Sequence, residues 1–163
     1  MSAQTSYNQK MSHGVAGGLY DLSNHTVDTR TNEEADGKVR FGLGVVAGTA
    51  AGKQVKLPTG DSAKKDFEGV VLNSHTHEQD YKGDVSLRVN ETVGVITDGR
   101  VYVRIAADAE PVYGDALYLI NSGDEAGYFT NEEGDNTVKV NGYFLGKKAT
   151  DAIAPVYVKV DKE

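Results

Sequence analysis

Residues 92–106, with the sequence TVGVITDGRVYVRIA, contain the clearest secondary-structure pattern in the chain. In the second half of this stretch, Val101 and Val103 alternate with arginine and tyrosine, which is the two-residue period of a strand with one buried face. The dipeptide Asp98-Gly99 lies between the two apolar runs, and such a dipeptide is typical of a two-residue hairpin turn. The stretch therefore predicts two antiparallel strands, one on each side of this dipeptide.

Short strand patterns occur on both sides of this hairpin candidate. They cover residues 39–45, 53–57, 67–73, 85–89, 116–120, 128–130, 137–145 and 155–160. The dipeptide Asn141-Gly142 interrupts one of them, so that segment is either a hairpin or a bulged strand. The only helical candidate is the short segment 61–66, and the chain lacks the strand–helix alternation of a parallel sheet. The sequence therefore predicts an all-β fold, a compact β-barrel or sandwich of about ten short strands.

Composition supports this fold class and excludes several functions. The chain contains 20 Val and 4 Ile but only 9 Leu, and β-branched side chains favour strands. A formal net charge of −7 argues against partners such as nucleic acid and anionic membranes, both of which need clustered Lys and Arg. The chain has no cysteine, so the fold is held by packing alone, and folding inside a cell is the simpler expectation. Neither a signal peptide nor a membrane-spanning apolar run is expected.

The first 38 residues differ from the rest of the chain. They are polar, rich in Ser, Asn, Thr and Gly, and show no sustained period. Their few apolar side chains are too sparse for a core but sufficient to attach an extended segment to another surface. We therefore divide the chain into an extended N-terminal arm, residues 1–38, and a β-barrel or sandwich domain, residues 39–163.

Candidate chemical sites are few. His75 and His77 would share one face of a strand, as two zinc ligands do, or form a solvated pair in a loop. Two acidic loops, 124–125 and 131–136, fit either calcium binding or ordinary turn chemistry, and neither has the EF-hand spacing. The chain lacks the local motifs of nucleotide-binding proteins and serine hydrolases. We therefore expect no catalytic residue, metal or cofactor.

Tyrosine is the most informative aromatic residue, since the chain has nine Tyr and no Trp. Tyrosine combines an apolar ring with a polar tip and is common at interfaces. Tyr102 and Tyr157 lie opposite the valine rows of their own predicted strands, so both are candidates for exposure. They fit ordinary positions at the edge of a core, contacts between subunits, or stacking on sugars.

A series of short segments along residues 14–158 resembles the structural cement, or capsid decoration, proteins of tailed bacteriophages. The segments are GVAGGLYD at 14–21, TRTNEE at 29–34, FGLGVV at 41–46, FEGVV at 67–71, TVGV at 92–95, GRVYV at 99–103, YGDALY at 113–118 and GYFT at 127–130. Their order and spacing carry the resemblance, which rests on no catalytic motif.

The resemblance implies a non-enzymatic protein of the virion. Such a protein is made in the bacterial cytoplasm, binds the outer surface of the capsid, bridges subunits of the major capsid protein and forms a homo-oligomer, for which we expect a trimer. The arm would then reach neighbouring subunits. Its candidate partner-binding residues are Tyr7, Leu19, Tyr20, Leu22, Val27 and Arg30. The alternative is a carbohydrate-binding or host-attachment module on the virion surface, and a small hydrolase built around His75 or His77 is a third hypothesis.

Overall fold

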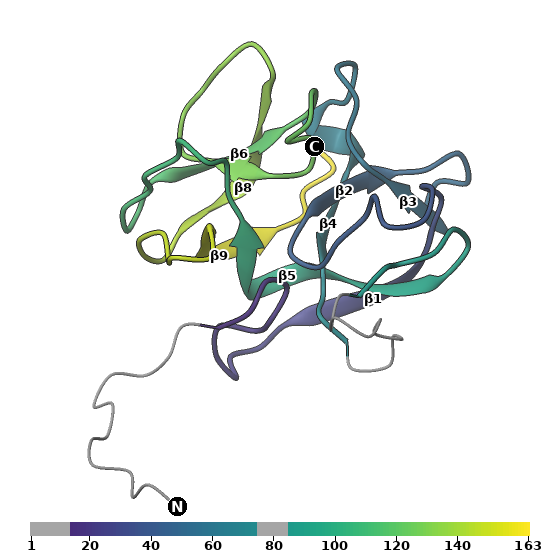
Figure 1. The fold of residues 1–163 in the computed structure, drawn as a ribbon, viewed down its shortest axis with the longest axis horizontal. Coiled ribbons are helices and arrows are strands. Elements are labelled where there is room, and N and C mark those ends of the chain that lie inside the picture. The colour runs from purple at the N-terminus through teal and green to yellow at the C-terminus, as the bar shows by residue number, and fades with distance from the viewer. Residues whose placement is uncertain (1–13, 75–84) are drawn as a thin grey trace, which may run out of the picture.

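A computed structural model describes residues 14–74 and 85–163 of the chain. In these residues it contains nine strands and one short 3₁₀ helix, and the predicted all-β barrel is confirmed (Figure 1). The strands are β1 (Thr26–Asn32), β2 (Gly44–Ala47), β3 (Gln54–Lys56), β4 (Phe67–Val71), β5 (Thr92–Arg104), β6 (Ala116–Ile120), β7 (Phe129–Thr130), β8 (Thr137–Phe144) and β9 (Ile153–Lys159). The helix η1 (Lys64–Asp66) falls within the segment that carried the only helical pattern.

Five strands close into a barrel. Their order is β1-β3-β2-β4-β5, and β5 pairs again with β1, so the sheet returns to its first strand. Among the strand pairs of the described residues, β1–β3 is the single parallel one. Full closure pairs the backbone of every strand on both sides and removes the exposed edges along which sheets aggregate.

The remaining strands continue the sheet from the second half of β5 in the order β5-β9-β8-β6-β7. In Figure 1 they form the green and yellow part of the molecule, beside the blue and purple barrel. Seven consecutive residue pairs join β5 to β9, from Asp98–Lys159 to Arg104–Ile153. Strand β5, with 13 residues, is therefore shared by both regions.

Two apolar clusters fill the molecule. The inner one lies within the barrel and consists of Val39, Phe41, Val45, Val55, Val71, Leu87, Val93 and Val95. The larger one lies between the barrel and the second sheet and includes Val46, Phe67, Val70, Ile96, Phe129 and Phe144. Neighbouring residues on β2, β4 and β5 thus belong to different clusters. Strands β2 and β4, and β5 at Val95-Ile96, are buried on both faces, which explains the continuous apolar runs at these positions.

The predicted hairpin at Asp98-Gly99 is wrong, because β5 runs through this dipeptide without turning back. Instead, the strand exchanges partners here: residues before Asp98 pair with β1 and β4, and residues after it pair with β9. Gly99 has a φ of +146°. A Cβ atom at this position would lie 2.8 Å from the Cβ of His25. Asp98-Gly99 therefore marks the point at which one long strand, β5, changes the strands with which it pairs.

Two further strand predictions differ from the structure, one open alternative is decided, and one strand, β1, was not predicted. Residues 39–43 form turns, and β2 begins only at Gly44, although Val39 and Leu43 are buried as the alternation suggested. Within 85–89, only Val85 makes a bridge. Asn141-Gly142 lies in one continuous strand, β8, whose pairing with β6 shifts register nearby, so the bulged alternative holds. Strand β1 lies within residues 1–38, so the sheet begins before the division proposed at residue 38.

Candidate interaction surface

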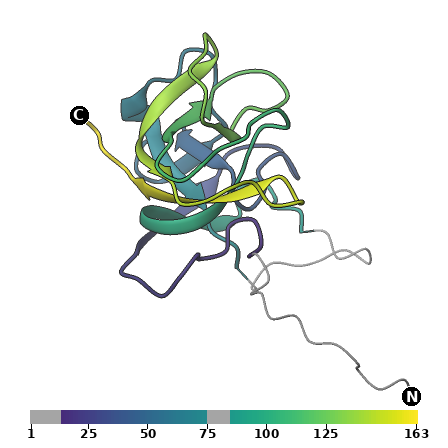
Figure 2. The same cartoon turned by 90° about the vertical axis from the view of Figure 1, so that its left-hand side faces the viewer.

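Residues 14–25 lie along the second half of β5, on the rim of the molecule (Figures 1 and 2). The amide of Gly17 donates a hydrogen bond to the carbonyl of Tyr102 at 2.7 Å, and the amide of Tyr20 donates to the carbonyl of Arg100 at 3.0 Å. Leu19 forms an isolated antiparallel bridge with Val101. We call residues 14–25 the rim loop. It follows the edge of the fold and is fixed to β5 by its backbone.

Asp21 attaches the rim loop by side-chain contacts as well. Its Oδ2 atom lies 2.7 Å from the guanidinium of Arg100, and its Oδ1 atom accepts hydrogen bonds from the hydroxyl and amide of Ser23. The two Ser23 hydrogen bonds, followed by the Arg100 contact, lower the pKa of Asp21 from 3.8 to about 2. The contact with Asp21 in turn raises the pKa of Arg100. The pair is exposed, so its contribution is to orient the loop.

The structure separates the predicted partner-binding residues into different environments. Leu22 is 96% exposed and Tyr20 is 42% exposed, both in the rim loop. Leu19 packs partly against the larger apolar cluster. Val27 lies on β1, opposite Ile96, and is 38% exposed. Tyr7 lies outside the described residues.

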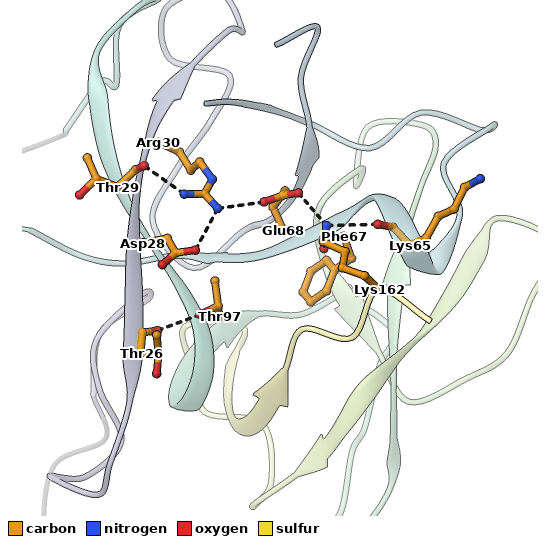
Figure 3. Close-up of polar contacts among 9 residues, drawn as sticks. All are labelled: Thr26, Asp28, Thr29, Arg30, Lys65, Phe67, Glu68, Thr97 and Lys162. Atoms are coloured by element: carbon orange, nitrogen blue, oxygen red, sulfur yellow. Dashed lines mark hydrogen bonds and ion pairs between the residues drawn. The ribbon is translucent and has the colours of Figure 1, made fainter. Parts of the chain in front are cut away.

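Arg30 lies in an internal ionic network (Figure 3). Its guanidinium contacts Asp28 at 2.9 Å and the buried carboxylate of Glu68 at 3.3 Å. The other oxygen of Glu68 lies 2.6 Å from the ammonium of Lys162, which also donates hydrogen bonds to the carbonyls of Lys65 and Phe67. The Nε atom of Arg30 is buried and has no hydrogen-bond partner. Arg30 therefore joins β1 to β4 and the C-terminal segment.

A group of tyrosines covers the outer face of β5, β9 and β8. Strand register places Tyr157 between Arg100 and Tyr143. The ring centroids of Tyr143 and Tyr157 are 5.6 Å apart, and that of Tyr113 lies 6.4 Å from Tyr143. These separations are typical of favourable aromatic contacts.

The rim loop extends this group at the other side of Arg100. The ring centroid of Tyr20 lies 5.7 Å from that of Tyr102. We call the six residues Tyr20, Arg100, Tyr102, Tyr113, Tyr143 and Tyr157 the tyrosine face. The hydroxyl of Tyr157 donates a hydrogen bond of 3.1 Å to Asp98, and burial together with this bond raises the pKa of Tyr157. Sequence patterns indicated Tyr102 and Tyr157 as candidates for exposure and Tyr20 as a candidate contact, but not their grouping, because the grouping depends on which strands are paired.

The two acidic loops lie close together around a shared cavity of about 400 Å³. Its lining includes the carboxylates Asp108, Asp124, Glu125, Glu132 and Glu133. Across residues 14–74 and 85–163, no three His, Cys, Asp or Glu side chains are arranged to hold a metal ion. The candidate pair His75 and His77 lies outside the described residues. The cavity is thus a concentration of negative charge.

The described part of the chain contains no helix that is both long and apolar enough to cross a bilayer. No curated protein matches the chain. A solved structure from the capsid of Myoviridae phage XM1 has a similar fold, with a TM-score of 0.73 and 20% sequence identity over 98% of each chain. The sequence model of one family, described as structural cement protein (E217 gp24/Pam3 gp6), matches residues 3–159. The chain therefore belongs to the structural cement protein family of bacteriophages.

Proposed function

We propose that this protein decorates the outer surface of a phage head, where it bridges neighbouring subunits of the major capsid protein and stabilises the shell. The observation that carries the proposal is the family match, which spans nearly the whole chain. The fold shared with a chain from a phage capsid supports it. The proposal also includes self-association on the shell, as a trimer.

The physical basis of such a role is binding linkage. A protein that binds only the assembled shell stabilises the shell by mass action. Contact with two or more subunits at once raises the effective concentration of each further contact, so the avidity exceeds the affinity of a single site by about 10²–10⁴. This function requires shape and contact area, and no reactive group.

The rim loop is the proposed site of contact with the capsid subunits. Leu22 extends from it into solvent, and Tyr20 is partly exposed beside the ring of Tyr102. Exposed apolar and aromatic side chains of this kind are typical of contact sites. Val27 and, from outside the described residues, Tyr7 are proposed as further contacts, with Leu19 holding the loop in place. We assign Arg30 a supporting role, because its guanidinium is occupied by Asp28 and Glu68 within the fold.

The test uses heads stripped of this protein and supplied again with the purified chain. Leu22→Asp places a charge where an apolar anchor is proposed, and we expect binding to the heads to weaken about tenfold, equivalent to about 1.4 kcal/mol. Val89→Asp is the matched control, because Val89 is also exposed, at 47%, and lies outside the rim loop. Binding is measured by co-sedimentation, and shell stability by the temperature at which packaged DNA becomes accessible to dye.

Adding the wild-type chain back to stripped heads should raise the temperature at which packaged DNA becomes accessible. Adding Leu22→Asp should raise this temperature less than adding Val89→Asp. The proposal fails if the wild-type chain does not bind the stripped heads or leaves their heat resistance unchanged. If the chain binds but the two variants are equally effective, the rim loop is not the contact site.

A further inference from the structure

Exposed apolar side chains are concentrated near the tyrosine face. Among the large hydrophobic residues that the structure describes as exposed, Tyr20 and Tyr113 belong to this face, and Tyr113 is 73% exposed. Val112, next to Tyr113 in the chain, is 48% exposed. At the other side, Gly14 leaves no room for a side chain against the ring of Tyr102, and the following residue, Val15, is 61% exposed. Exposed apolar side chains gathered in one region of a surface are typical of a protein contact site.

The tyrosine face is also rigid. Four of its six side chains, those of Arg100, Tyr102, Tyr143 and Tyr157, stand on three hydrogen-bonded strands. The opposite face of these strands packs in the larger apolar cluster, where Val101, Val156 and Val158 are fully buried. Docking on a preformed surface loses less conformational entropy than docking on a mobile one. Tyrosine and arginine are moreover the residues that most often dominate the energy of a protein interface.

Charge indicates what kind of partner fits this face. Arg100 is paired with Asp21 at 2.7 Å, and Asp98 lies opposite Lys159 across the β5–β9 pair. Asp21 therefore has a cation beside it, and Asp98 accepts the hydrogen bond of the Tyr157 hydroxyl. The chain as a whole carries −7, and five carboxylates gather around the acidic cavity of the second sheet. Two copies of the chain repel one another least where the charges of both are already balanced.

The same arrangement is complementary to itself. Arg100 lies between Asp21, across from it in the rim loop, and Asp98, two residues before it on β5. About a two-fold axis, each residue that reaches a partner residue is reached by the same residue in return, and about a three-fold axis the contacts run head to tail from one copy to the next. Arg100 of one copy can then approach an aspartate of the other while the tyrosine rings pack between them.

We infer that the tyrosine face is the surface on which a second copy of this chain docks. This inference rests on the self-association included in the proposed function and names its contact surface. Tyr20 belongs to both proposed surfaces, so the test below changes Tyr113 and Tyr143, which lie outside the rim loop. Two faces can meet directly about a two-fold axis, or three can converge on a three-fold axis.

The experiment compares the full-length chain with the double variant Tyr113→Ala/Tyr143→Ala by sedimentation equilibrium and light scattering over a range of concentrations. We expect the wild type to have a mass two or three times that of one chain, and the double variant to dissociate at concentrations at least tenfold higher than those that dissociate the wild type. Val89→Ala, exposed outside the tyrosine face, is the control and should keep the wild-type mass. Circular dichroism checks that every variant is folded.

A wild-type chain that is monomeric at its highest soluble concentration overturns the inference, as does an oligomer whose mass the double variant leaves unchanged. Binding of the wild-type and double-variant chains to stripped heads separates this result from the proposed function. A monomer that binds the heads contradicts the tyrosine-face inference together with self-association and leaves the capsid role standing, whereas an oligomer that does not bind them contradicts only the capsid role. A monomer that binds a glycan array through Tyr113 and Tyr143 also overturns self-association and favours the carbohydrate-binding alternative.

Discussion

The closed barrel and the second sheet share β5 but expose different kinds of surface. In the barrel, β2 and β4 are buried on both faces, one face toward the inner cluster and the other toward the larger cluster. In the second sheet, β5 and β9 bury one row of side chains and leave Tyr102 and Tyr157 on the other. Strands β2 and β4 therefore have no free face for a partner, whereas β5 and β9 have one.

This difference indicates that the two regions have different roles. A barrel closed on itself is a stable support, since all its strands are paired and its inner cluster is filled mainly by valine. The second sheet depends on the barrel to cover its apolar face, and its outer face is left for contacts. The rim loop lies at the boundary, because it is fixed to the half of β5 that belongs to the second sheet.

The largest expected effect is that of Phe129→Ala, which tests whether the two regions are stable independently. Phe129 is fully buried on β7 and packs edge-on against Phe67, with ring centroids 6.3 Å apart. Removing the ring leaves a cavity between the barrel and the second sheet, and we expect the free energy of unfolding to fall by about 3–5 kcal/mol. Urea denaturation followed by circular dichroism measures this change.

Because β5 belongs to both regions, Phe129→Ala should shift one cooperative transition rather than create two. Val89→Ala serves as the exposed control and should change the free energy of unfolding by less than about 0.5 kcal/mol. Two separate transitions, with the barrel unfolding as in the wild type, would show that the second sheet is an independent unit.

A smaller effect is expected at Glu68, the other point where the two regions are joined. Its buried carboxylate lies between Arg30 of β1 and Lys162, which follows β9. Glu68→Gln leaves the guanidinium without its buried counter-charge. Because Lys162 is half exposed and can turn to water, we expect a loss of about 2–3 kcal/mol, below that of a fully buried pair.

The matched control for Glu68 is Lys64→Gln. It removes the ion pair between Lys64 and Asp161, which also holds the C-terminal segment but is solvent-exposed on both sides. Such pairs contribute about 0–1 kcal/mol. If Glu68→Gln and Lys64→Gln cost the same in thermal denaturation, burial of the Glu68 network does not contribute as argued.

The sequence predicted the strands correctly where one face is buried or where an apolar run is continuous. Val101 and Val103 are fully buried, and Tyr102 between them is not, as their alternation indicates. The run at Val70-Val71 is a strand buried on both sides. Both patterns follow from local burial, because the spacing of apolar side chains reflects which faces of a strand are buried.

The sequence failed where the outcome depends on distant partners. Asp98-Gly99 has the composition of a hairpin turn, but tertiary pairing with β1 and β9 keeps the backbone extended. Val39 and Leu87 are buried outside any strand, so apolar side chains alternate there without forming one. A turn preference is a small free-energy difference that strand pairing outweighs.

Prediction of the candidate site was limited for the same reason. Exposure of Leu22 and Tyr20 followed from their polar surroundings in the sequence, whereas the buried ionic role of Arg30 depends on Glu68, 38 residues away. Tyr113 and Tyr143 join the tyrosine face only through the pairing of β8 with β9. The pairing register of β8 and β9 cannot be read from any local sequence pattern.

The smallest expected effect concerns the attachment of the rim loop, and it is read from the pKa of Asp21. This carboxyl has a pKa of about 2 in the folded protein, against 3.8 for the ordinary group. Since the folded-state pKa is the lower one, the stabilisation that Asp21 provides is complete above about pH 4 and is lost as the pH falls toward 2. Carboxyl ¹³C chemical shifts followed over this range measure the pKa directly.

Ser23→Ala removes the hydroxyl donor and should raise the pKa of Asp21 part of the way toward 3.8, because the amide of residue 23 and Arg100 remain. Asp161, whose pKa is lowered by its own contacts with Glu163 and Lys64, is the internal control and should not move. An Asp21 pKa near 3.8 in the wild type would mean that the rim loop is not held to β5 by this side chain, and that the surface proposed to meet the capsid is less ordered than the sheet beside it.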